Sequence, residues 1–109
     1  MSEQVNPSHI MQVGTGFMAS KTLLSAVELE LFTRLGREAM TGPQIAEALG
    51  LHARAIPDFP DALVALGLLD REGEGSDALY RNTVETATFL DKASPTYIGG
   101  ILEMANARL

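Results

Sequence analysis

The feature that most constrains this chain is an apolar pattern of helical spacing that starts near residue 10 and continues to residue 35. Asn6 followed by Pro7 favours a helix start, because the Asn side chain can cap free amides and an early proline sacrifices no helical hydrogen bond. The apolar side chains cover more than one face, whereas a helix that packs on a small core needs only one stripe. We therefore expect region 7–35 to dimerise. The predicted interface residues are Ile10, Met11, Val13, Phe17, Met18, Leu23, Leu24 and Val27.

Two glycines, Gly14 and Gly16, lie inside this pattern, and each costs a helix about 1 kcal/mol relative to alanine. We expect a kink or a close helix crossing near them, and an end of the helical region at Gly36. Their spacing resembles part of a nucleotide-binding loop, but no predicted strand precedes them and a third glycine is missing. We therefore assign them no cofactor-binding role.

Residues 41–67 have the pattern of a helix-turn-helix, which is two short helices joined by a tight turn that contains glycine. Thr41 and Gln44 form a predicted capping box at the start of the first helix. Because prolines disturb the second helix, we expect its regular part to start near Asp58, with Pro60 tolerated in the first turn.

Two short extended runs around a glycine-rich loop follow in residues 68–82 and predict a β-hairpin, or wing. A short helix is expected over 83–91 and a final helix over 95–109, opened by Ser94 and Pro95. The final helix has no stop signal, so either it frays or the chain is part of a longer protein. The predicted fold of domain 1–109 is mainly α: a winged helix-turn-helix with a long N-terminal dimerisation region and a small hairpin wing.

Composition excludes several classes of partner and site. The net charge of −6 opposes binding to a phosphate backbone, so we expect no nucleic-acid partner. The absence of cysteine excludes disulfides and thiolate chemistry, and His9 and His52 have no ligand-spaced neighbour, so we predict no catalytic and no metal-binding residues. The N-terminus lacks the pattern of a signal peptide, and no apolar run approaches the roughly 18 residues of a membrane span. We expect a cytoplasmic protein without a membrane partner.

Taken in order, these elements resemble the N-terminal winged-helix dimerisation domain of S-adenosylmethionine-dependent small-molecule O-methyltransferases, of the plant phenolic and bacterial natural-product type. The resemblance extends from about residue 8 to residue 109, and the order and spacing of its segments are more specific than any single motif. It rests on Phe17–Leu24, Ala26–Phe32, Ala62–Leu69, Tyr80–Thr83 and Ser94–Leu109.

The resemblance implies that the N-terminal helices of two subunits interlock and that each module helps to enclose a substrate pocket. Met11, Met18 and Met104 would lie on the helices that face the dimer or the pocket. It also implies a catalytic domain that follows the last helix and holds S-adenosylmethionine. This chain would bind no cofactor and catalyse nothing by itself. It would meet a small, aromatic or polyketide-like hydroxylated substrate only together with a catalytic domain.

Two other functions fit the same elements. A dimeric winged-helix transcriptional regulator needs basic or amide side chains on its reading helix. Residues 51–66 offer Arg54 as the basic residue, against Asp58 and Asp61. A free-standing dimerisation or docking module cannot be separated from a methyltransferase segment on sequence alone.

Overall fold

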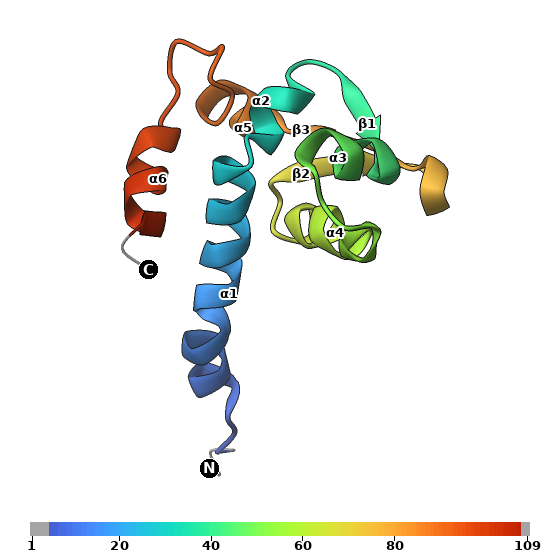
Figure 1. Cartoon of the computed structure of the whole chain (residues 1–109). Helices are drawn as coiled ribbons and strands as arrows, with labels where there is room; N and C mark the ends of the chain where they lie inside the picture. Colours follow the sequence, from blue (N-terminus) through green and yellow to red (C-terminus); the bar gives the residue numbers. More distant parts are fainter. Residues whose placement is uncertain (1–4, 108–109) are drawn as a thin grey trace.

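The structure is a computed structural model that describes residues 5–107, with the backbone alone for residues 15 and 105–107. Residues 1–4 and 108–109, which include the last two positions of the predicted helix 95–109, lie outside the described residues. Among the described residues, helices dominate and a small sheet projects to one side (Figure 1).

The N-terminal region is a long helix, α1 (Ser8–Glu28), followed by a short helix, α2 (Leu31–Leu35). The Asn6 side chain accepts a hydrogen bond of 2.9 Å from the amide of Ser8. Helix α1 nevertheless begins one residue later than predicted, with Pro7 and not Asn6 at the N-cap position. Helix α1 continues through both glycines. The kink or close helix crossing expected near them stays a prediction.

The helical region is interrupted at Glu30, which adopts a left-handed conformation with φ of 62°. This conformation is uncommon for a residue that carries a Cβ atom. It separates α1 from α2, and α2 then ends at Gly36, which has φ of 54°. The predicted end of the region at Gly36 is therefore confirmed.

The helix-turn-helix follows the predicted local signals. Thr41 accepts a hydrogen bond from the amide of Gln44, and the Gln44 side chain accepts one from the amide of Thr41, so the capping box is present. The second helix starts at Asp58, as expected, with Pro60 in its first turn. The elements are α3 (Gly42–Leu49), a 3-10 turn η1 (Ala53–Ala55) and α4 (Asp58–Ala65).

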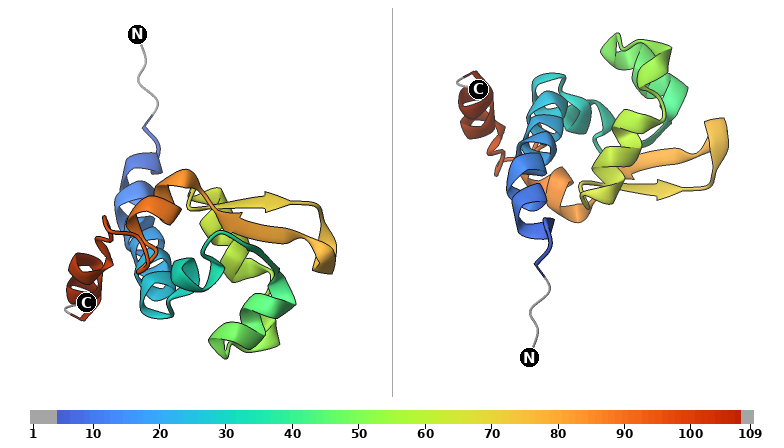
Figure 2. Two further views of the ribbon diagram at one scale, coloured as in Figure 1. Left: turned by 90° about the horizontal axis from the view of Figure 1, so that it is seen from above. Right: turned by 90° about the horizontal axis from the view of Figure 1, so that it is seen from below.

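The predicted wing is an antiparallel hairpin of β2 (Leu69–Glu72) and β3 (Leu79–Asn82), joined by a loop that holds the 3-10 turn η2 (Gly75–Asp77). A third strand, β1 (Ala39–Thr41), pairs antiparallel with β3, in the sheet order β1-β3-β2. Sequence reasoning missed β1, because three residues are too few to show alternation. Figure 2 shows the hairpin on the side of α1 opposite to α6.

The C-terminal part holds α5 (Val84–Phe89) and α6 (Gly99–Ala107). Helix α5 lies within the predicted range 83–91, and its capping box is formed by Thr83 and Thr86. The final helix begins at Gly99 and not at residue 95, which corrects the prediction.

The reason for the later start of α6 lies in contacts with the end of α5. The side-chain hydroxyls of Ser94 and Thr96 each lie 2.6 Å from the carbonyl oxygen of Thr88. The amide of Ile98 donates to the carbonyl of Phe89 at 2.8 Å. These bonds hold residues 94–98 against α5 and keep them out of a helix.

One hydrophobic core joins the C-terminal half of α1 to the winged-helix elements. Its largest fully buried side chains come from α2, α3, α4 and the sheet, so these elements share one interior. Core residues include Ala26, Val27, Leu31, Phe32, Leu35, Ile45, Leu63, Leu69, Tyr80 and Leu90.

Asn82, at the end of β3, connects three elements through its side chain. Its Nδ2 atom donates to the carbonyl oxygens of Phe32, at 2.9 Å, and Gly36, at 3.0 Å. Its Oδ1 atom accepts from the hydroxyl of Thr86, which is fully buried. The carbonyl of Phe32 also accepts a hydrogen bond of 3.0 Å from the amide of Gly36. Asn82 therefore adds hydrogen bonds to the C-terminal end of α2, where the last carbonyls have few partners within the helix.

We predict that Asn82→Ala lowers the free energy of unfolding by about 1–3 kcal/mol, because it removes part-buried hydrogen bonds to the carbonyls of Phe32 and Gly36 and to the hydroxyl of Thr86. Asn82→Asp should lose most of the same stability, since it keeps the acceptor for Thr86 but has no donor for the two carbonyls. Urea unfolding measures both. Asn6→Ala is the control, with an exposed, local contact. An Asn82→Ala chain as stable as the Asn6→Ala chain would contradict the prediction.

Candidate functional site

The N-terminal half of α1 extends beyond the rest of the molecule and carries large apolar side chains that face solvent (Figure 1). Ile10 is 72% exposed and Phe17 is 67% exposed. Soluble monomers rarely leave a contiguous group of such side chains in water. We call this group the α1 surface; it consists of Ile10, Met11, Val13, Phe17 and Met18.

The other three predicted interface residues lie in the C-terminal half of α1, where the chain's own core covers the helix. Leu24 and Val27 are buried, at 5% and 3% exposure, and Leu23 is partly buried against the same core. The prediction that Leu24 and Val27 face a partner is corrected, because contacts within the chain already remove them from solvent. The assignment of the five residues of the α1 surface to an interface stays a prediction.

Gly14 lies at the centre of the α1 surface. Because residues three and four apart share a helix face, its neighbours there are Ile10, Met11, Phe17 and Met18. Gly16 has Val13 as the one member of the α1 surface at such a spacing. A Cβ atom added at either glycine would meet nothing within 4 Å in the described structure.

Helix α6 lies beside α1 and adds three exposed apolar side chains, Ile98 just before the helix, and Ile101 and Met104 within it (Figure 2). Lys92 forms an ion pair with Glu30 and lies 3.9 Å from Glu103 of α6. The hydrogen bond from Lys92 lowers the pKa of Glu30, and the same bond raises the pKa of Lys92. These groups are exposed, so the pairs contribute little to stability.

The three methionines expected to line a substrate pocket are all exposed. Met11 and Met18 lie on the α1 surface, and Met104 lies on α6 at 60% exposure. None of the three lines the pocket that lies between α3 and the wing. Their pocket-lining role stays a prediction.

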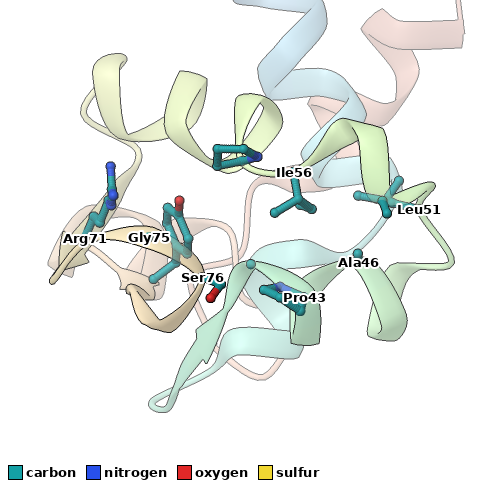
Figure 3. Close-up of a pocket in the computed structure, with 11 residues that line it drawn as sticks. Pro43, Ala46, Leu51, Ile56, Arg71, Gly75 and Ser76 are labelled. Atoms are coloured by element: carbon teal, nitrogen blue, oxygen red, sulfur yellow. The ribbon is translucent and has the colours of Figure 1, made fainter.

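The pocket between α3 and the wing is mainly apolar and has a volume of about 520 Å³ (Figure 3). The buried ring of Tyr80 forms one wall, and its hydroxyl donates to Asp61 at 2.5 Å. Burial, with help from the Asp61 carboxylate, raises the pKa of Tyr80 to about 12, so the hydroxyl stays protonated near neutral pH. Arg71 lies at the same end, 3.4 Å from Asp61.

The charges of the helix-turn-helix and wing are arranged unlike those of a DNA-reading surface. Asp58 and Asp61 occupy the first turn of α4, which is the second helix of the motif. The arginines of the hairpin are paired with acids, Arg71 with Asp61 and Arg81 with Glu72 at 3.0 Å. Arginines that are already paired with acids attract a phosphate backbone less strongly.

The histidines do not form a site. His9 is exposed on α1, and the Nδ1 atom of His52 accepts a hydrogen bond of 3.1 Å from the amide of Arg54, as a capping residue does. Across residues 5–107 there is no group of three or more His, Cys, Asp or Glu side chains that could hold a metal ion. In the same range, no helix has the length and apolar character needed to cross a membrane.

Comparison with known proteins identifies the protein family of this chain. Residues 11–92 match the family model of the O-methyltransferase dimerisation domain. The chain belongs to this family. The match covers α1 from Met11 onward and all the winged-helix elements through α5, so it includes the α1 surface except Ile10.

Curated relatives of this dimerisation domain are methyltransferases. The tetracenomycin polyketide synthesis 8-O-methyl transferase TcmO of Streptomyces glaucescens is 44% identical over 103 residues, which are 94% of this chain and 30% of that protein. The acetylserotonin O-methyltransferase of Rattus norvegicus is 33% identical over 86 residues, which are 79% of this chain and 19% of that protein. The chain spans less than a third of the length of these relatives.

Solved structures give the same result for the fold. The human N-acetylserotonin methyltransferase in complex with SAM has a TM-score of 0.82 and 28% identity, over 94% of this chain and 31% of that chain. The structure of PigF with SAH has a TM-score of 0.81 and 26% identity, over 94% of this chain and 29% of that chain. The dimerisation domain thus has the fold of one segment of these methyltransferases.

We predict that the chain does not bind duplex DNA, because its net charge is −6 and the hairpin arginines are paired with acids. Fluorescence anisotropy with a labelled mixed-sequence duplex at low salt should show no binding, beside a basic winged-helix protein as the positive control. Binding that weakens steeply as salt is added would contradict the prediction, since that slope reports the neutralisation of phosphates.

Proposed function

We propose that the chain forms a homodimer through the α1 surface and acts as the dimerisation and substrate-enclosing module of a small-molecule O-methyltransferase. The observation that carries the proposal is the exposed apolar half of α1 in a chain of the dimerisation family. A helix of 21 residues is about 32 Å long, which is more than one small core can cover.

The energetics favour a partner on this helix. Isolated helical segments of about 12 residues are marginal in water, and two glycines weaken this one further. Fully burying one large apolar side chain contributes about 1.5–3 kcal/mol. In a symmetric dimer each residue of the α1 surface counts twice, which is enough to offset the loss of translational and rotational freedom on association.

The names of the relatives suggest the chemistry of the whole enzyme. One relative is named for an 8-O-methyl transfer in polyketide synthesis and another for the methylation of a hydroxylated naphthoate. By analogy, we assign to the full enzyme a hydroxylated aromatic or polyketide-like substrate and S-adenosylmethionine as methyl donor. The cofactor would be held outside this chain, because residues 5–107 contain no parallel strands joined by a helix.

The enclosing role is assigned to the exposed methionines. Met side chains are flexible and polarisable, so they adapt to irregular or planar partners. Met11 and Met18 on α1 and Met104 on α6 lie on two adjacent helices at the end of the molecule away from the wing. In a dimer, this end would form one wall of a substrate pocket completed by a catalytic domain.

We predict that Phe17→Asp weakens dimerisation at least tenfold, because it places a charge inside an apolar contact. Val84→Asp is the matched control: Val84 is 86% exposed and lies on α5, so the same kind of change should leave the dimer intact. Sedimentation equilibrium gives the molar mass of each chain. A deletion of residues 1–19 should be monomeric under the same conditions.

Two outcomes would refute the proposed dimer. One is a parent chain that stays monomeric at concentrations on the order of ten micromolar, where a complex with a micromolar dissociation constant is populated. The other is a deletion chain that dimerises as tightly as its parent.

Substituting the two glycines of α1 gives a second test, in which helix stability and dimer affinity should change in opposite directions. Gly14→Ala and Gly16→Ala should each raise the intrinsic stability of the helix by about 1 kcal/mol, because each added methyl group has open space. If a partner helix crosses closely over Gly14, the first change weakens dimerisation at least threefold while the second does not. Circular dichroism and sedimentation equilibrium measure the two effects. Equal dimer affinities for both variants would show that no close crossing occurs at Gly14.

A further inference from the structure

The pocket between α3 and the wing is separate from the surface assigned to dimerisation. No described residue of α1 or α6 lines it, and it lies between the helix-turn-helix and the hairpin (Figure 3). Its volume of about 520 Å³ falls within the range of small-molecule sites. Neither dimerisation nor the enclosure of a substrate by α1 and α6 uses this pocket.

The walls of the pocket are fixed by contacts within the chain. The capping box of Thr41 and Gln44 sets the start of α3. A Cβ atom on Gly42 would lie 2.6 Å from Cγ2 of Ile56, so glycine at this position lets Ile56 pack directly against α3. Tyr80 is 1% exposed, and its hydrogen bond to Asp61 holds the ring in place. A preformed cavity of this kind costs little to occupy, since few groups must be ordered.

The chemistry of the lining differs from one end of the pocket to the other. Apolar walls around the open space are made by Pro43, Leu51 and Ile56 (Figure 3), and Pro57 also lines the pocket. Among the described residues, Arg71 is the one charged residue that lines it. Such walls exclude a strongly hydrated ligand and favour an apolar one.

The end of the pocket near Arg71 suits an uncharged hydrogen-bond acceptor better than an anion. Asp61 lies 3.4 Å from Arg71 and neutralises much of its charge. Within the described part of the chain, that ion pair engages the Nη1 atom, while a guanidinium has five N–H donors in all. Donors are therefore present without a net positive charge, which is the condition for recognising a carbonyl oxygen and not a phosphate.

We propose that this pocket binds a small apolar molecule that carries a carbonyl oxygen. The apolar part lies against Pro43, Leu51 and Ile56, and the carbonyl accepts a hydrogen bond from Arg71. The described lining residues all belong to one chain, so the test needs neither a dimer nor a catalytic domain.

The test uses two bicyclic probes that differ in one group, 1-indanone and indane, titrated into the ¹⁵N-labelled chain. The amide resonances of Gly42, Ile56, Arg71 and Ser76 should shift and saturate with 1-indanone. Indane should bind at the same residues about fivefold more weakly, because it cannot accept the hydrogen bond. Shifts that do not saturate, or that map to the α1 surface, would overturn the proposal, as would equal affinities for the two probes.

Three variants locate the binding. Arg71→Met should reduce the affinity for 1-indanone to that for indane and leave indane unchanged, which separates the hydrogen bond from a general loss of structure. Ala53→Trp, at an exposed position on the rim, should block the pocket and lower both affinities at least tenfold. Ser76→Trp is a second blocking variant if Ala53→Trp unfolds. Phe17→Asp should bind both probes as the parent does. Unchanged binding to a folded blocking variant would refute the site.

Discussion

The structure depends on the mismatch between the length of α1 and the size of the core beneath it. The C-terminal half of the helix places Leu24, Ala26 and Val27 in that core, and the left-handed Glu30 then turns the chain so that α2 packs on the same interior. Among the described residues, the core extends no further toward the N-terminus, so large apolar side chains in the first half of α1 stay more than half exposed. Helix stability and surface chemistry both make that half the natural place for a partner.

The winged-helix elements are held together by polar groups that find partners inside the chain. Asn82 satisfies the carbonyls at the end of α2, and the paired charges of Arg71 and Asp61 connect the hairpin to α4. In a DNA-binding protein with this fold, the reading helix and wing must offer such groups to the nucleic acid. Here these groups connect elements of the chain to one another.

Local physical chemistry made much of this fold predictable from sequence. The capping box of Thr41 and Gln44, the start of α4 at Asp58 and the end of α2 at Gly36 each depend on residues within a few positions of one another. The wrong predictions concern elements whose existence or bounds depend on residues far away in the sequence. Strand β1 exists because Met40 pairs with Tyr80, and the start of α6 is delayed because Ser94 and Thr96 bind the carbonyl of Thr88.

The predicted interface on α1 likewise depends both on local spacing in the sequence and on contacts with distant residues. Helical spacing correctly gathered apolar residues on α1, but spacing alone cannot tell a side chain that faces the core from one that faces a partner. Phe17 and Leu24 are seven residues apart and lie on the same side of the helix, yet one is 67% exposed and the other 5%. The difference arises because the core ends between them, and that boundary depends on where α2, α4 and the sheet pack. A sequence pattern can therefore name the apolar stripe, whereas the tertiary structure alone shows which part of it is left for a second molecule.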